Sequence, residues 1–270
     1  MKTTRILIGI GAGLAIAAVP FVGQTQTIKL RTLDTLSAGT TPSGQVIGAS
    51  PAEPGKWPAT FVFRNSAKVG CTATAIGLRT ILTAAHCMKN GETAEVSATD
   101  PPTKIECVHN PKYPNDVSAD FALCFAKANL PRPNGGFEQV NVNGAEVPVG
   151  RSITLLGYGC LQVNGIDRNF GTLFEGPAIV QAVADRDNFI RTADGAAVCS
   201  GDSGGGAYVA VGEGGIQRRL FAVNSRGDLS TNSWLSVTHK PDFVGWAKSL
   251  ADNHSTRICG LHADANNCRQ

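Results

Sequence analysis

The stretch Cys199-Ser200-Gly201-Asp202-Ser203-Gly204-Gly205 contains the strongest signal in this chain. It sets one serine between glycines, directly after an aspartate. Gly201 has no Cβ and so permits a tight turn, in which the amides of Gly201 and Ser203 can point at one spot. A developing oxyanion needs two such converging amides during acyl transfer. The stretch therefore predicts Ser203 as a nucleophile, with Gly201 and Ser203 forming an oxyanion hole. The alternative is a glycine-rich loop that matches by chance.

A base and an orienting acid can be assigned upstream of this serine. A serine hydroxyl needs a base to become nucleophilic, and that base needs a partner to orient it. His86 follows the apolar and β-branched run 80–82, which predicts a buried strand. Asp120 begins the apolar run 121–125, where an unpaired carboxylate would be costly to bury. We therefore expect Asp120 to pair with His86, whereas the neighbours of Asp116 are typical of a solvated turn. The alternatives are a core histidine for His86 and a strand cap for Asp120.

The three candidates occur in the order His86, Asp120, Ser203. With this order, the chain resembles the chymotrypsin/trypsin-like serine endopeptidases, and it is similar to the secreted, bacterial-type members of that family. The resemblance extends from about Val46 to Trp246. The motifs that carry it are TAAHC (83–87), DFAL (120–123), GYG (157–159), GDSGG (201–205) and Ser225-Arg226-Gly227. It implies an all-β fold of two six-stranded antiparallel β-barrels, with the active site between them and a C-terminal helix. It also implies a triad in which Ser203 attacks, His86 transfers the proton and Asp120 orients the imidazole.

Composition agrees with this fold class. The 31 glycines and 14 prolines favour many turns, and short apolar runs recur between them. The runs that predict strands are 59–63, 153–156, 178–183 and 220–223. Helical periodicity appears mainly at 243–250, where the family has its terminal helix. A scattered net charge of +3, with no basic run interleaved with aromatics, argues against a nucleic-acid partner.

The first residues predict export. Lys2 and Arg5 precede an apolar stretch from Ile6 to Val19, which is the layout of a secretory signal peptide, and the stretch is short for a membrane span. We expect a signal peptide over 1–23, a propeptide over 24–45, the peptidase domain over 46–250 and a disulfide-closed tail over 251–270. The predicted location is therefore secreted, either extracellular or periplasmic, with no membrane anchor.

The segment that starts at Val46 predicts how the protein is activated. Residues 46–58 resemble the mature amino terminus of the family. There, a cut before the first residue frees an α-amino group that pairs with the aspartate preceding the nucleophile, here Asp202. A buried Asp202 would need such a cation, and Val46 would supply it. Gln45 precedes this cut, where a trypsin-like activator needs Arg or Lys. Either another kind of activating protease acts here, or the cut lies elsewhere.

Export would allow the eight cysteines to pair. The resemblance implies a Cys71–Cys87 bridge beside the histidine. For the other six cysteines, proximity along the chain favours Cys107–Cys124, Cys160–Cys199 and Cys259–Cys268. The family normally joins Cys199 to a cysteine after the nucleophile, but none lies between Ser203 and Ile258. A zinc site is the competing interpretation, and the lack of a CxxC pair disfavours it. We expect no metal and no cofactor.

The resemblance assigns the substrate-binding residues to Ala197, Val198, Ser225, Arg226 and Gly227. Ala197 occupies the position where trypsin-like enzymes have an aspartate, so a Lys or Arg of the substrate would remain unpaired. A neutral pocket that favours apolar side chains is therefore expected. Gly227 matches the glycine that leaves the pocket mouth open. Arg226 replaces the usual aromatic residue and alters the shelf for the extended substrate.

The predicted function is thus a secreted serine endopeptidase, acting as a monomer on protein or peptide substrates after an activating protease has cut it. Two alternatives belong to other classes. One is a catalytically idle trypsin-fold binding protein, which the intact triad and oxyanion glycines disfavour. The other is a secreted esterase, because residues 201–205 also satisfy G-x-S-x-G. In an α/β-hydrolase, however, the acid and the histidine follow the serine, whereas here both precede it.

Overall fold

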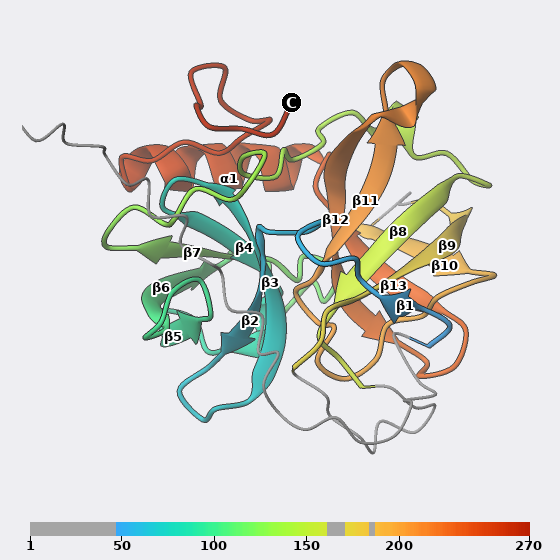
Figure 1. The fold of residues 1–270 in the computed structure, drawn as a ribbon, viewed down its shortest axis with the longest axis horizontal. Coiled ribbons are helices and arrows are strands. Elements are labelled where there is room, and N and C mark those ends of the chain that lie inside the picture. Colours follow the sequence, from blue (N-terminus) through green and yellow to red (C-terminus); the bar gives the residue numbers. More distant parts are fainter. Residues whose placement is uncertain (1–46, 161–170, 184–186) are drawn as a thin grey trace, which may run out of the picture.

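The computed structural model describes residues 47–160, 171–183 and 187–270 (Figure 1). Within these ranges the chain forms thirteen strands, one α-helix and three short 3-10 helices. The 3-10 helices are η1 (Ala85–Cys87), η2 (Gly144–Glu146) and η3 (Glu213–Gly215). The predicted signal peptide (1–23), propeptide (24–45) and new amino terminus at Val46 lie outside the described residues.

Six antiparallel strands close the first barrel, in the order β2-β3-β4-β7-β6-β5. Their bounds are β2 (Thr60–Arg64), β3 (Gly70–Gly77), β4 (Thr80–Thr83), β5 (Thr93–Val96), β6 (Thr103–His109) and β7 (Ala122–Ala126). Strands β3, β4 and β7 are buried along their whole length. Their small, β-branched and apolar residues suit a sheet that is covered on both faces.

A second six-stranded barrel follows, in the order β8-β9-β10-β13-β12-β11. It closes because β8 pairs with both β9 and β11. The bounds are β8 (Ser152–Gly157), β9 (Phe174–Ala182), β10 (Phe189–Ala193), β11 (Gly206–Val211), β12 (Gln217–Gly227) and β13 (Ser233–Val237). The short β1 (Ser50–Pro51) pairs with the start of β9. The predicted fold of two six-stranded antiparallel barrels is therefore confirmed.

The terminal helix α1 (Pro241–Asn253) packs against the first barrel although it follows the second in the chain (Figure 1). Proline suits the first helical position because its missing N–H has no partner there. Phe243, Ala247 and Ala251 recur every four residues and form the buried face, and Phe243 contacts Phe121 of the first barrel with ring centroids 4.7 Å apart. The helix predicted near 243–250 is confirmed, and the predicted start of the tail, residue 251, lies inside its last turn.

All eight cysteines are paired, and no cysteine is free. The four bridges are those expected: Cys71–Cys87, Cys107–Cys124, Cys160–Cys199 and Cys259–Cys268. The last of these bridges closes the tail. In the ranges that the structure describes, no helix is both long and apolar enough to pass through a membrane.

Candidate active site

His86 lies in the one-turn helix η1, directly after β4. Ala84 and Ala85 are fully buried, whereas the His86 side chain is 32 % exposed, so the small residues pack inward and the ring faces the solvent side. The Cys71–Cys87 bridge ties η1 to β3. The strand predicted to end near the histidine is thus present, and a disulfide fixes the turn that carries the ring.

Asp120 precedes β7 and is fully buried. Its Oδ1 accepts the backbone N–H of His86 at 2.9 Å, and its Oδ2 lies 2.6 Å from His86 Nδ1. The Ser225 hydroxyl also donates to Oδ2, at 2.5 Å. Burial alone would raise the pKa of this carboxyl, but the hydrogen bonds and charge of His86, together with the Ser225 hydroxyl, hold the pKa below its usual value. Asp120 is therefore an ionised partner for the imidazole.

Ser203 completes the arrangement, because its Oγ lies 2.8 Å from His86 Nε2. The loop around it uses a left-handed backbone at Gly201, with φ of 103°. From β3, Thr72 binds this loop twice. Its N–H donates to the Ser203 carbonyl at 2.8 Å, and its hydroxyl donates to the Gly201 carbonyl at 2.9 Å. The first barrel thereby holds a loop that belongs to the second.

The backbone amides of Gly201 and Ser203 donate to no acceptor among the described residues. They remain available to a ligand oxygen, as the sequence predicts for an oxyanion hole. On the imidazole, a proton on Nδ1 facing the Asp120 carboxylate leaves Nε2 as an acceptor for the Ser203 hydroxyl. A Ser-His-Asp arrangement at the junction of two β-barrels defines the class of trypsin-like serine proteases.

The comparisons with known proteins agree with that class. The family model described as trypsin matches residues 46–239, and the chain belongs to the trypsin family. Among solved structures, the chain is similar to neuropsin, a serine protease expressed in the limbic system of mouse brain. The two share 20% sequence identity with a TM-score of 0.57, over 76% of this chain and 99% of neuropsin, so this likeness concerns the fold. No curated protein matches the chain.

Asp202, beside the predicted nucleophile, is fully buried. Its carboxylate accepts the N–H of Gly159 and that of Cys199, each at 2.8 Å. A Cβ on Gly159 or on Gly157 would lie 2.5 Å or less from this carboxylate, which explains the glycines of the GYG motif. Burial raises the pKa of Asp202 to about 7, and no cation contacts it within the described ranges.

The described chain begins beside this loop. Ile47 forms an antiparallel bridge with Ala197, with N···O distances of 3.0 and 2.9 Å. The predicted activation residue Val46 directly precedes Ile47 and lies outside the described residues. The structure therefore places the segment that begins at Ile47 beside Ala197, shortly before Cys199 and Asp202 in the chain.

The residues predicted to bind substrate lie in two segments, 197–198 and 225–227. Ala197 and Val198 are buried, with 0 % and 3 % exposure. Gly227 packs directly on Val198: the space is so narrow that a Cβ at Gly227 would lie 2.7 Å from the Val198 carbonyl oxygen. Arg226 is exposed, and its guanidinium lies 5.5 Å from the centroid of the Phe189 ring. The structure thus brings Val198 and Gly227 together and leaves Arg226 on the surface beside them.

Ser225 and Thr72 show where sequence reasoning was incomplete. The sequence predicts Ser225 as a substrate-binding residue, whereas its hydroxyl donates to Asp120, so this side chain has a different role from the predicted one. The signal was present in the sequence, since Ser225 is polar and follows the apolar run 220–223. Thr72 lies 129 residues before Gly201 and 131 before Ser203, the two residues that it binds in the serine loop (199–205), and no local pattern distinguishes it.

Proposed function

We propose that this protein is a serine endopeptidase that cleaves peptide bonds through Ser203, His86 and Asp120. The observation that carries the proposal is one continuous chain of contacts: Asp120 Oδ2 to His86 Nδ1 at 2.6 Å, and His86 Nε2 to Ser203 Oγ at 2.8 Å. Membership of the trypsin family supports it.

In the proposed mechanism Ser203 Oγ attacks the scissile carbonyl carbon while His86 Nε2 takes the hydroxyl proton. Asp120 keeps the imidazole in the required tautomer and stabilises its charged form. The amides of Gly201 and Ser203 stabilise the oxyanion. The imidazolium then protonates the leaving amine, which breaks the C–N bond and leaves an acyl-enzyme at Ser203. A water molecule, deprotonated by His86, hydrolyses this ester and regenerates the serine.

Activation by a cut before Val46 is part of the proposal. The new α-ammonium would pair with Asp202, a buried carboxylate for which burial without a cation is costly. The bridge between Ile47 and Ala197 supports this step, because it holds the segment after Val46 beside the loop of Asp202. The pairing would order the turn from Gly201 to Ser203.

The proposed specificity is for apolar rather than basic side chains. Ala197 and Val198 supply no charge to pair with Lys or Arg. Two acids close in sequence to the predicted binding residues, Asp194 and Asp228, are already engaged. Asp228 accepts three backbone N–H groups of its own loop, those of residues 230–232, and Asp194 accepts from the Gln181 side chain.

Secretion after removal of residues 1–23, followed by loss of the propeptide 24–45, is proposed as well. Four disulfides support an oxidising location, because such bridges form and persist outside the reducing cytosol. The proposed partners are protein or peptide substrates and an activating protease, with the enzyme acting as a monomer.

The proposal is tested by peptide hydrolysis with protein that begins at Val46. Ser203→Ala should abolish turnover, and Asp120→Asn should lower it by roughly four orders of magnitude. Ser249→Ala, on the exposed side of α1, is the matched control and should retain full activity. Hydrolysis by Ser203→Ala at the parent rate would refute the assignment. A parent protein that binds peptides without cleaving them would favour the alternative of an idle trypsin-fold binding protein.

A further inference from the structure

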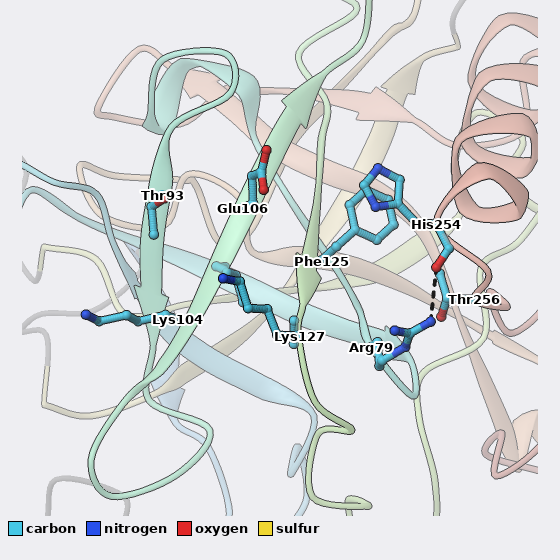
Figure 2. A pocket seen from close by; sticks show the side chains of 10 residues that line it. Arg79, Thr93, Lys104, Glu106, Phe125, Lys127, His254 and Thr256 are labelled. Carbon is cyan, nitrogen blue, oxygen red and sulfur yellow. Dashed lines mark hydrogen bonds between the residues drawn. The ribbon is translucent and has the colours of Figure 1, made fainter.

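A cavity of about 360 Å³ opens on the first barrel, between β6, β7 and the residues that follow α1 (Figure 2). The residues of interest in its lining are Arg79, Lys104, Glu106, Phe125, Lys127 and His254. None of them belongs to the triad, the serine loop or the predicted substrate-binding residues. The cavity is therefore a separate feature of the molecule.

The strands of the first barrel keep this cavity away from the triad. Arg79 directly precedes β4, whereas His86 follows the other end of that strand. In the same way, Asp120 precedes β7 and Lys127 follows it. A strand rises about 3.3 Å per residue, so Asp120 and Lys127 are separated by roughly 20 Å along β7. A ligand in the cavity would not contact Ser203.

The cavity carries an excess of positive charge. Arg79 Nη2 donates to the carbonyls of His254 and Ser255 at 3.0 and 2.7 Å, which fixes the guanidinium. Its Nε and Nη1 donate to no acceptor among the described residues, and a guanidinium has donors to spare for an anion. In the part of the chain that the structure describes, neither Lys104 nor Lys127 forms an ion pair, whereas other lysines do.

Two carboxylates lie near these cations. Glu106 lines the cavity, and Figure 2 shows it on the opposite side of the cavity from Arg79. Glu95, opposite Lys104 in the β5–β6 register, is paired with Lys68 at 2.8 Å. Among the described residues of the lining, Glu106 is the single carboxylate, against the three cations Arg79, Lys104 and Lys127, so the cavity is positively charged overall.

One wall of the cavity is flat. The His254 ring stacks on the Phe125 ring with a centroid separation of 3.8 Å and an interplanar angle of 3° (Figure 2). Phe125 is 8 % exposed, whereas His254 is exposed to solvent. The outer face of the imidazole can therefore receive a second planar ring.

We propose that this cavity binds an aromatic anion, with its phosphate or carboxylate group among Arg79, Lys104 and Lys127 and its ring stacked on His254. Lys and Arg side chains are the usual partners of such groups, and charge-assisted hydrogen bonds are the stronger ones. The volume exceeds that of a bare phosphate or carboxylate group and leaves room for the ring. The site stands independently of the proposed peptidase activity.

The test uses phenyl phosphate as the probe, with binding followed through the NMR signals of the His254 ring and by calorimetry on the full chain. We expect saturable shifts of these signals. The double variant Lys104→Gln/Lys127→Gln should weaken binding about tenfold, a change of about 1.4 kcal/mol. Glu106→Gln should strengthen it, since one opposing charge is removed. Lys248→Gln, an exposed lysine of α1 outside the cavity, is the matched control and should bind as the parent does.

Two further probes separate the charge from the ring. Benzoate should bind at the same place, because it carries a carboxylate on a ring, whereas phenol and inorganic phosphate should bind at least tenfold more weakly than phenyl phosphate. The proposal is overturned if the His254 signals do not saturate, or if the double variant and Lys248→Gln bind equally well. It is also overturned if inorganic phosphate binds as tightly as phenyl phosphate. These readouts do not involve hydrolysis, so loss of the peptidase assignment would leave them unaffected.

Discussion

Asp202 gives the uncleaved chain a pH dependence of stability that Asp202→Asn should remove. Burial raises the pKa of this carboxyl from 3.8 to about 7 in the folded chain. Between these values the folded state keeps the proton and the unfolded state releases it, so the unfolded state binds fewer protons. Stability must therefore fall as the pH rises from about 4 to about 7, and then level off. A difference of about three between the pKa values of the folded and unfolded states corresponds to roughly 4 kcal/mol of unfolding free energy.

The assay is urea-induced unfolding of the uncleaved chain at a series of pH values between about 4 and 8. A Ser203→Ala background prevents self-processing. The difference in unfolding free energy between the parent and Asp202→Asn isolates this carboxyl from the other titrating groups. That difference should grow by several kcal/mol in favour of the variant as the pH rises through the window.

Asp228→Asn is the matched control. This exposed carboxylate accepts hydrogen bonds from its own loop, principally from Asn232, and its pKa is lowered to about 2. Its titration lies below the window, so the control should run parallel to the parent. A parent and an Asp202→Asn variant with the same pH dependence would refute the reasoning. In protein that begins at Val46 the slope should disappear from the parent, since the new ammonium would hold Asp202 ionised.

Three more predictions concern the site. Ser225→Ala should lower kcat/KM by about 10- to 100-fold, because Asp120 loses one of its hydrogen bonds, worth about 1.5–3 kcal/mol to a charged group; unchanged kinetics would contradict this role. Replacing Cys160 and Cys199 by serine should lower the unfolding free energy by about 4 kcal/mol, from the 39-residue separation that the bridge closes; equal urea midpoints would contradict it. Ala197→Asp should raise cleavage after Lys and Arg relative to apolar residues on a peptide library, and an unchanged profile would remove this position from the pocket.

Much of the fold follows from local sequence patterns. The apolar run that starts at Asp120 predicts a strand, and β7 forms there (Ala122–Ala126). The helical periodicity over 243–250 predicts α1, since one apolar face is enough to specify a helix. Closure of the two barrels follows only from the family resemblance, because strand order depends on contacts between residues far apart in the chain.

The sequence predicts those site residues whose side-chain type and surrounding motif point to a specific chemical role. His86, Asp120 and Ser203 are brought together as expected. The contacts of Ser225 with Asp120 and of Thr72 with the serine loop were not found, because both join segments more than 100 residues apart through ordinary hydroxyl groups. The basic cavity was missed for a similar reason, since Arg79, Lys127 and His254 come from separate elements and share no motif.

Labelling with a fluorophosphonate tests the central claim most directly. A fluorophosphonate reacts readily with a serine that a base activates and beside which an oxyanion hole accepts the phosphoryl oxygen. With protein that begins at Val46, peptide mapping by mass spectrometry should find one phosphonyl group, on Ser203, and His86→Ala should remove it. A label on any other residue, or no label on a folded and cleaved protein, would contradict the assignment of Ser203 as the nucleophile.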